Sequence, residues 1–362
     1  MRTIQPRTGP RPFVSVILPI RNEAAFIERT LGAVLNQSYP AERIEVLIAD
    51  GMSTDETRAV IARTAAAHPS ISVTVLDNPR RIVPTGLNLA LARARGDVII
   101  RVDGHTIIAG DYIEQCVLAL QRSHADNVGG RMDAVSETLF GRAVALATSS
   151  PFGVGGARFH YSDQEEWVDT VYMGAWPRSV FEWNGMFDEE LVRNQDDEFN
   201  YRLLERGGRI RLCPRIQSRY YARSTPRGLC RQYAQYGFWK VRVMQKHLRE
   251  MRARQFVPPL FVAMLIALAA LTPFVPAFRW PLYGVLGTYA LGALVSSAQA
   301  MGRPGWPLLP LVALTFPMLH ISYGSGFLLG LVVFLPRTIW RDGIRARTTS
   351  EARPSRRPVS NS

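Results

Sequence analysis

Cysteine is scarce in this 362-residue chain, and the few cysteines form no pattern. Cys116, Cys213 and Cys230 stand far apart and include no C-x-x-C pair. This spacing argues against a disulfide framework or a cysteine zinc site and favours reduced thiols in the cytosol. The N-terminal stretch MRTIQPRTGPRP contains no apolar run, so we expect no secretory signal.

Acidic residues are nearly absent from the last third of the chain. The net charge is +13, and from residue 240 onward 15 Lys and Arg face only 3 Asp and Glu. The first 239 residues, with 28 basic and 27 acidic groups, are almost neutral. A nucleic-acid-binding domain needs its basic residues on a folded surface, whereas these residues flank apolar segments. We therefore expect a membrane as partner and no nucleic acid.

The apolar segments lie late in the chain. Segments 256–278 and 281–301 contain no Asp, Glu, Lys or Arg, and a membrane-spanning helix needs about 20 apolar residues. Two crossings are therefore predicted. A third stretch, 305–336, contains prolines and YGSG and is long for one crossing but short for two. Within it, His320 is interpreted as a hydrogen-bonding link between helices.

Basic residues bracket this region. Six Lys and Arg lie in 240–254 and seven in 337–357. If both clusters stay in the cytoplasm, the number of crossings is even. This favours four short spans, or two spans and a re-entrant hairpin, and three spans with an exported tail is the alternative.

The first 130 residues alternate short apolar runs with helical patterns. Runs rich in β-branched residues occupy 13–20, 44–50, 71–77 and 97–103, and helical patterns occupy 23–36, 54–67 and 84–95. This order predicts an α/β domain with a parallel sheet and right-handed crossovers. Ligands bind such sheets beyond the carboxyl ends of the strands, which is where Asp50 and Asp103 fall.

A glycine-rich phosphate loop is missing. The first strand leads into PIRNEAAF, whereas a dinucleotide-binding sheet would have G-x-G-x-x-G there. A bound diphosphate would then need another source of positive charge, and a divalent cation held by carboxylates fits. Asp103 and His105, after the fourth strand, are the candidate ligands.

Four blocks of sequence, in this order, resemble family 2 inverting glycosyltransferases, which use sugar nucleotides. The blocks are VSVILPIRNEAAFIERTLGAVLNQSYP, VLIADGMSTDET, IVPTGLNLALARARGDVIIRVDGHT and MFDEELVRNQDDEFNYRLLERGGRI. SPFGVGGARF, DTVYMGAWPR and RQYAQYGFWK resemble more closely the membrane-bound exopolysaccharide enzymes, such as succinoglycan-type glucosyltransferases. The resemblance covers residues 13 to 245 and implies a GT-A fold with a Rossmann-like, mostly parallel sheet.

The resemblance also implies a donor site. The positions that match nucleotide-sugar contacts are Pro19, Arg21, Glu23, Asp50, Arg80, Arg81, Asn88 and Asp103. Asp103 and His105 would hold Mn²⁺ or Mg²⁺, with His105 in place of the Asp that usually ends the family's D-x-D motif. Imidazole suits Mn²⁺ better than Mg²⁺, which prefers oxygen ligands. Alternatively, His105 caps the next loop and Asp103 alone holds the ion through water.

The expected catalytic base lies in QDDEF. The family's Glu-Asp pair aligns with Gln195-Asp196, so Asp196 is the base candidate and Asp197 the adjacent alternative. In the inverting mechanism this carboxylate removes the proton of the acceptor hydroxyl. Because Gln195 is neutral, it should not raise the pKa of Asp196 as an acidic neighbour would. The structural alternative is an acidic first turn of a helix.

The acceptor candidates that the resemblance implies are Trp176, Arg202, Tyr236 and Trp239. A buried structural role is almost equally plausible for Trp176. Aromatic and basic residues alternate through 227–254, which is typical of a helix in the headgroup layer. QYGFW resembles the Q-x-x-R-W motif of processive synthases but lacks its arginine.

The sequence thus predicts a GT-A domain on a membrane module, with the catalytic domain on the cytoplasmic side of the inner membrane. The predicted parts are an N-terminal extension (1–12), the GT-A domain (13–226), an interfacial segment (227–254), a transmembrane module (255–336) and a basic cytoplasmic tail (337–362). The expected reaction moves one hexose from a UDP-hexose to a polyprenyl-diphosphate-linked glycan. The alternatives are a processive polysaccharide synthase and a non-catalytic scaffold that binds sugar nucleotides.

Overall fold

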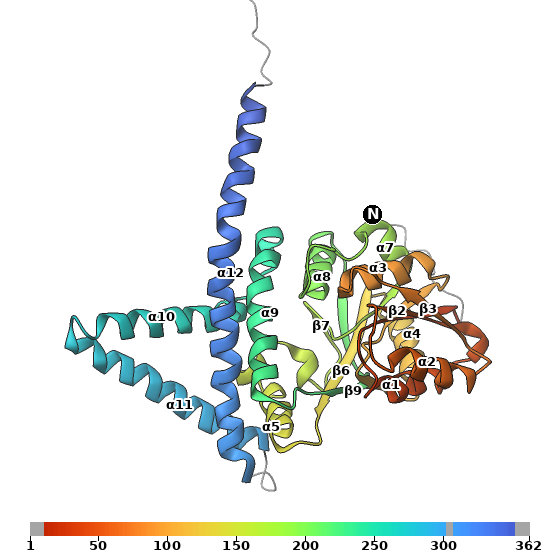
Figure 1. Cartoon of the computed structure of the whole chain (residues 1–362), viewed down its shortest axis with the longest axis horizontal. Helices are drawn as coiled ribbons and strands as arrows, with labels where there is room; N and C mark the ends of the chain where they lie inside the picture. The colour runs from red at the N-terminus through yellow and green to blue at the C-terminus, as the bar shows by residue number, and fades with distance from the viewer. Residues whose placement is uncertain (1–10, 302–306, 352–362) are drawn as a thin grey trace, which may run out of the picture.

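The computed structural model describes residues 11–301 and 307–351 of the chain. Within these residues, one sheet contains β1 (Val14–Ile20), β2 (Ile44–Asp50), β3 (Ser72–Asp77), β4 (Val98–Arg101), β5 (Thr106–Ile108), β6 (Asn127–Val135), β7 (Glu166–Val168), β8 (Ala175–Pro177) and β9 (Ile210–Tyr221). The helices are α1 (Ile27–Leu35), α2 (Thr57–Ala66), α3 (Val83–Arg93), α4 (Tyr112–Ser123), α5 (Leu139–Thr148), α6 (Pro151–Val154), α7 (Ser179–Asn184), α8 (Gln195–Glu205), α9 (Pro226–Lys246), α10 (Val257–Leu271), α11 (Arg279–Met301) and α12 (Leu309–Glu351). Figure 1 shows the sheet with its helices on one side of α9 and the long helices α10 to α12 on the other.

The sheet is mixed, which corrects the mostly parallel sheet expected from the sequence. β3, β2, β1 and β4 are parallel neighbours in that order, as the alternation of strands and helices predicts. Beyond β4 the order is β8, β6, β9 and β5, and β8 is antiparallel to β4 and β6. β5 and β7 are antiparallel to β9, whereas β6 and β9 are parallel. β5 and β8 are three-residue strands entered from loops, without the crossover helix that joins parallel neighbours.

The strands of the parallel half place alternate residues on opposite faces, because side chains alternate along a strand. Val16 and Leu18 of β1 pack with residues of α1 and α4. Ile17, between them, packs with residues of α3, α7 and α8 on the other face. Both faces are therefore covered, and polar side chains reach solvent beyond the strand ends.

α9 and α12 lie side by side with their backbones in close contact (Figure 1). A Cβ on Gly326 would stand 2.0 Å from the carbonyl oxygen of Ala234, and a Cβ on Gly237 would stand 2.0 Å from that of Tyr323. Small residues allow helices to approach this closely. Four short spans, or two spans and a re-entrant hairpin, would require a break within 305–336, but α12 is continuous from Leu309 onward. The YGSG stretch therefore serves helix packing and does not end the helix.

α10 and α11 form a hairpin that projects away from the α9–α12 pair (Figure 1). Among the described residues, two helical segments are long and apolar enough to cross a membrane, Ala253–Leu271 and Leu309–Phe334. The predicted crossing at 281–301 forms α11 but is not one of these two. Nδ1 of His320 lies 2.7 Å from the hydroxyl of Tyr289 in α11, so the predicted link between helices is confirmed.

The predicted boundaries shift at the C-terminus. α12 continues to Glu351, so the predicted tail (337–362) begins as helix. Residues 352–362, and residues 1–10 of the predicted extension, lie outside the described residues. The predicted interfacial segment, 227–254, is mostly α9, which packs along α12 and also contacts α8.

Candidate active site

The loop after β4 comes close to the loop after β1. A Cβ on Gly104 would stand 2.9 Å from Cγ2 of Ile20 and 3.0 Å from Cγ of Glu23. A side chain at this position would force the loops apart, which explains the glycine between Asp103 and His105. Nδ1 of His105 lies 3.1 Å from Oε1 of Glu23. Three predicted donor-site residues therefore lie together at the carboxyl edge of the sheet.

Asp103 is held by a buried arginine, Arg101, the last residue of β4. Nε of Arg101 donates to Oδ1 of Asp103 at 2.7 Å, and Nη2 donates to Oδ2 at 3.2 Å. Within residues 11–301 and 307–351, no group of three or more His, Cys, Asp or Glu side chains is placed to hold a metal ion. Asp103 and His105 fit a divalent cation that takes further oxygen ligands from a diphosphate. Asp103 would have to turn from Arg101 to bind it.

Asp196 approaches the same guanidinium from the other side. It lies in the first turn of α8, after Asn194, which has a left-handed φ of 60°. Nδ2 of Asn194 donates to the carbonyl oxygen of Tyr236 at 2.8 Å, which ties this turn to α9. Oδ2 of Asp196 lies 4.0 Å from Nη1 of Arg101. The base candidate and the metal-ligand candidate Asp103 therefore share one cation.

The pKa of Asp196 is raised above its ordinary value. Burial contributes most and the charge of Asp197 adds to the rise, while Arg101 opposes it. The side chain is still 44% exposed, so solvent moderates these effects. A carboxyl group with a raised pKa holds a proton more readily, which suits a general base.

Asp197, the alternative base, is already paired. Its carboxylate forms an ion pair with Lys240 of α9, whose side chain is only 6% exposed. Burial alone would lower the pKa of Lys240, but Asp197 and, to a smaller extent, Tyr201 raise it, so the lysine stays charged. Protonating Asp197 would leave a buried cation without a partner. The geometry therefore favours Asp196 as the base.

Glu198 and Arg202 bind each other within α8. Nε of Arg202 donates to Oε1 of Glu198 at 2.8 Å, and Nη2 donates to Oε2 at 2.9 Å. Nε2 of His247, just after α9, lies 3.1 Å from Oε1 of Glu198, and its Nδ1 lies 2.7 Å from Oε2 of Glu205. Nη2 of Arg202 also donates to the carbonyl oxygen of Met186 at 2.7 Å. These bonds indicate that Arg202 positions α8, and they lend no support to its predicted acceptor contact.

Two predicted donor residues are held by neighbouring loops. Asp50 is buried, and its carboxylate accepts from the backbone N–H of Ser53 at 3.1 Å and pairs with Arg58. Nδ2 of Asn88 donates to the carbonyl oxygen of Phe187 at 2.9 Å, and its Oδ1 accepts from the N–H of Phe187 at 3.0 Å. Asn88 therefore fixes the loop before α8.

The other predicted donor residues lie nearer the surface. Arg80 forms an ion pair with Glu189. Arg81, with a left-handed φ of 60°, and Arg21 are exposed, while Pro19 in β1 is half-buried. Exposed arginines after β1 and β3 remain accessible to an anionic ligand.

Of the two candidate tryptophans, Trp176 is buried and Trp239 is partly buried. Trp176 is 2% exposed, and its ring centroid lies 6.1 Å from that of Phe187 and 5.7 Å from that of Phe199. This environment matches the buried structural role and leaves Trp176 unable to contact an acceptor in this conformation. Trp239 packs on Phe334 of α12, with centroids 5.7 Å apart.

Tyr236 is an acceptor candidate whose hydroxyl lies among other polar side chains. Nε2 of Gln232 donates to its hydroxyl at 2.8 Å and to that of Tyr220 at 3.3 Å. The ring of Tyr220 packs on that of His105, with centroids 5.4 Å apart. Burial raises the pKa of Tyr236, and Tyr220 and Asp196 add to the rise. The side chains of Tyr220, Gln232 and Tyr236 therefore form a polar group between His105 and Asp196.

Comparison with known proteins identifies the family. Residues 15–182 match the model described as glycosyl transferase family 2. The chain is 31% identical to the succinoglycan biosynthesis protein ExoA of Rhizobium meliloti (strain 1021), over 89% of this chain and 96% of that protein. The chain belongs to glycosyl transferase family 2. The resemblance stated from its motifs is confirmed.

Two further relatives extend the comparison over the length of the enzyme. One, from Methanococcus voltae, is dolichyl N-acetyl-alpha-D-glucosaminyl phosphate 3-beta-D-2,3-diacetamido-2,3-dideoxy-beta-D-glucuronosyltransferase, 26% identical over 88% of this chain and 97% of that protein. The other is the solved mannosyltransferase PcManGT of Pyrobaculum calidifontis in complex with GDP-Man and Mn²⁺. It shares the fold with a TM-score of 0.58 and 22% identity, covering 89% of this chain and 87% of that one. This family 2 glycosyltransferase thus has a GT-A-type fold and acts in polysaccharide or glycan biosynthesis.

Sequence reasoning missed two cations of the glycosyltransferase site. Arg101 carried a signal, because it is the one charged residue in the apolar run VIIRV and a buried strand has few reasons to contain arginine. Lys240 carried none, since it is one of six basic residues in its segment. Only the packing of α9 against α8 distinguishes it from the others.

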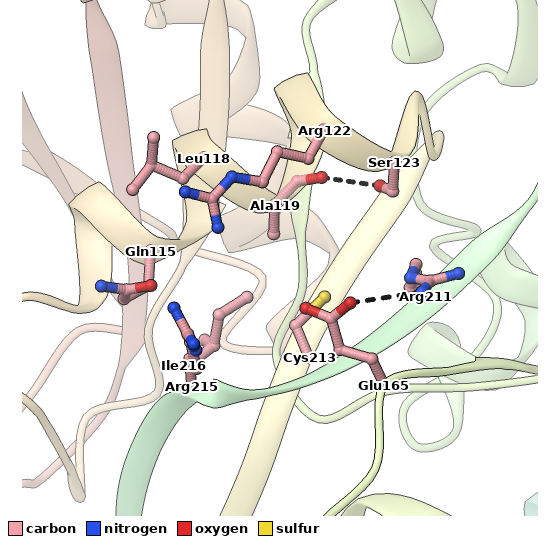
Figure 2. Close-up of a pocket in the computed structure, with 10 residues that line it drawn as sticks. All are labelled: Gln115, Leu118, Ala119, Arg122, Ser123, Glu165, Arg211, Cys213, Arg215 and Ile216. Atoms are coloured by element: carbon pink, nitrogen blue, oxygen red, sulfur yellow. Dashed lines mark hydrogen bonds and ion pairs between the residues drawn. The ribbon is translucent and has the colours of Figure 1, made fainter.

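A separate cavity of about 30 Å³ lies between α4 and β9 (Figure 2). Arg122 of α4 and Arg211 and Arg215 of β9 line it, and Nη2 of Arg211 lies 3.2 Å from Oε2 of Glu165. None of the predicted site residues contributes to this cavity. It is therefore distinct from the site around Asp103 and does not enter the function proposed below.

Proposed function

We propose that this enzyme transfers one hexose from a UDP-hexose, with inversion, to a polyprenyl-diphosphate-linked glycan. The observation that carries the proposal is the position of Asp103 and Asp196 on either side of Arg101. One carboxylate lies where a sugar nucleotide binds such sheets, and the other lies where an acceptor can deliver a proton. Donor binding and proton removal would thus occur in one site.

Asp196 would remove the proton of the acceptor hydroxyl as that oxygen attacks the anomeric carbon. The bond from this carbon to the diphosphate oxygen breaks, and UDP leaves with the bonding electrons. General-base catalysis of this kind contributes about 10²–10⁴ in rate. The ion pair between Lys240 and Asp197 would hold the turn that carries Asp196.

Asp103 and His105 would hold Mn²⁺ or Mg²⁺, which supplies positive charge at the diphosphate. The residues proposed to contact the nucleotide sugar are Pro19, Arg21, Glu23, Asp50, Arg80, Arg81 and Asn88. Tyr236 is proposed to contact the acceptor glycan. The solved relative with GDP-Man and Mn²⁺ supports a nucleotide-sugar donor and a divalent cation.

A membrane-bound acceptor is supported by the apolar helices and by the relatives. Ala253–Leu271 and Leu309–Phe334 are long enough to cross a bilayer, and the Methanococcus voltae relative is named for a dolichyl-linked substrate. We propose a multi-pass protein of the inner membrane whose catalytic domain, residues 13–226, lies in the cytoplasm. The helices of 255–336 would then keep the enzyme where its lipid substrate is confined.

The proposal is tested by incubating purified enzyme with a panel of UDP-sugars, a polyprenyl-diphosphate glycan and Mn²⁺. Release of UDP that requires both the acceptor and one UDP-hexose, with a lipid product heavier by one hexose, supports single transfer. Products that lengthen with time indicate a processive synthase. Donor binding by calorimetry without turnover on any lipid acceptor indicates the non-catalytic scaffold.

A further inference from the structure

Arg101 contacts both halves of the site, although no motif assigns it a role. Its residue is 6% exposed, and its backbone N–H donates to the carbonyl oxygen of Gly174 at 3.1 Å, which fixes the start of the side chain. Nε and Nη2 bind Asp103, as described above. Nη1 points toward Asp196 at 4.0 Å. The guanidinium therefore contacts both the donor-side carboxylate, Asp103, and the acceptor-side carboxylate, Asp196.

The bonding of this guanidinium is incomplete. Nη1 is buried and has no hydrogen-bond partner among the described residues. A distance of 4.0 Å allows charge attraction but exceeds a hydrogen bond. Buried donors are almost always paired, and leaving one unpaired is unfavourable. A shift of the guanidinium toward Asp196 would give Nη1 a hydrogen-bond partner. The two hydrogen bonds to Asp103 oppose this shift.

We propose that Arg101 is a positioning residue that exchanges partners when the donor binds. In the free enzyme Arg101 holds Asp103. When Asp103 turns to the cation that accompanies the donor, Arg101 is released and Nη1 completes a hydrogen bond to Asp196. The base is then oriented for the acceptor hydroxyl only when a donor is present. This inference rests on the function proposed above, since it needs a donor at Asp103 and a base at Asp196.

Arg101→Gln tests the exchange, with UDP affinity measured by calorimetry in the presence of Mn²⁺ and kcat measured by UDP release. The expected result is a fall in kcat of about 10²-fold, as for a misplaced catalytic group. UDP affinity should be unchanged or tighter, because Arg101 no longer competes for Asp103. Loss of UDP affinity in parallel with kcat would mean that Arg101 only holds Asp103 in place, and the exchange would be refuted.

A double-mutant cycle with Asp196→Asn tests whether Arg101 acts through the base. Residues that act as a unit give non-additive effects. Adding Arg101→Gln to Asp196→Asn should therefore change kcat little. If the fold-loss of kcat in the double variant equals the product of the two single losses, Arg101 does not act through Asp196 and the exchange is refuted. Arg211→Gln, at a surface arginine paired with Glu165, is the matched control and should leave kcat unchanged.

Thermal unfolding followed by circular dichroism will show whether Arg101→Gln is folded. If it is not, Arg101→Lys provides a second test of the exchange. Lysine keeps the charge but lacks the planar fork in which Nε and Nη2 bind Asp103 while Nη1 faces Asp196, so kcat should fall while UDP affinity is retained. Wild-type kcat in Arg101→Lys would overturn the exchange. If Asp103→Ala and Asp196→Asn are themselves fully active, the proposed site is wrong. If they are inactive and both Arg101 variants are active, only the exchange is wrong.

Discussion

Lys240 and Asp197 form an ion pair that joins α9 to the first turn of α8, directly beside Asp196. The lysine is almost fully buried, so its charge depends on this carboxylate. The pair has two consequences. It removes Asp197 from consideration as a free base, and it connects the turn that carries Asp196 to a helix packed along α12. The predicted catalytic carboxylate is thus supported from the side of the apolar helices.

Asp197→Asn should destabilise the protein more than it slows the reaction. The substitution leaves the buried Lys240 without an anion, and breaking a buried ion pair in this way costs about 3–5 kcal/mol. We expect a lower melting temperature in detergent and a smaller loss of kcat than in Asp196→Asn.

The double variant Asp197→Leu with Lys240→Met provides the control. Replacing a buried ion pair by apolar residues of similar volume is often neutral, so the pair of substitutions should recover much of the lost stability. A melting temperature for Asp197→Asn equal to that of the wild type would show that the pair does not support α8.

His247 should make the stability of the α8–α9 contact depend on pH. Burial alone would lower its pKa, but the bonds to Glu198 and Glu205 raise it above 6.5. A group whose pKa is raised by folding stabilises the folded state below its unfolded pKa. This contribution is lost as pH rises through the raised folded pKa.

The measurement is chemical unfolding of the wild type and His247→Gln between about pH 6 and about pH 9. The wild type should lose stability relative to the variant as pH rises. Parallel curves for the two proteins would contradict the raised pKa.

Gly326→Ala should weaken the contact between α9 and α12. The added Cβ would meet the carbonyl oxygen of Ala234 at 2.0 Å, so one helix backbone has to move. Overpacking typically costs about 1–3 kcal/mol. Gly284→Ala in α11 is the matched control, because nothing lies within 4 Å of its Cβ position. In detergent, the melting temperature of Gly326→Ala should be lower than that of the wild type, and the melting temperature of Gly284→Ala should be unchanged. Equal melting temperatures for the two variants would argue against close packing of α9 and α12.

His105→Asp should change the metal preference of the reaction. If His105 is a ligand, Mn²⁺ should support faster turnover than Mg²⁺ in the wild type, because Mg²⁺ prefers oxygen ligands. The aspartate variant should narrow this difference, measured as UDP release with each ion in turn. The same ratio of rates in both proteins would favour the alternative in which His105 only caps its loop.

The parallel half of the sheet could be predicted from the sequence because its strands are apolar runs of β-branched residues. The runs at 13–20 and 44–50 coincide with β1 and β2 to within one residue. The first two helices begin three or more residues later than their patterns, at Ile27 and Thr57, whereas α3 begins at Val83, one residue before its pattern. Polar residues of the intervening loops bond across to each other, as Asn22 does with Ser53 at 2.8 Å.

The mixed half and the buried cations could not be predicted in the same way. β5 and β8 are three residues long, too short to show a period. The close packing of α12 on α9 depends on Gly326 facing Ala234, and the role of Lys240 depends on where α9 meets α8. Each of these is a contact between elements far apart in the chain. The local pattern of apolar and polar residues cannot predict such contacts.

The most direct test compares UDP release and UDP affinity in Asp196→Asn, with the lipid acceptor and Mn²⁺ present. If Asp196 is the base, kcat should fall by about 10²–10⁴-fold while calorimetry shows unchanged UDP affinity, because the donor is proposed to bind on the Asp103 side of Arg101. In Asp103→Asn, the main effect should instead be a loss of UDP affinity measured in the presence of Mn²⁺. Turnover of Asp196→Asn at the wild-type rate would contradict the assignment of the base.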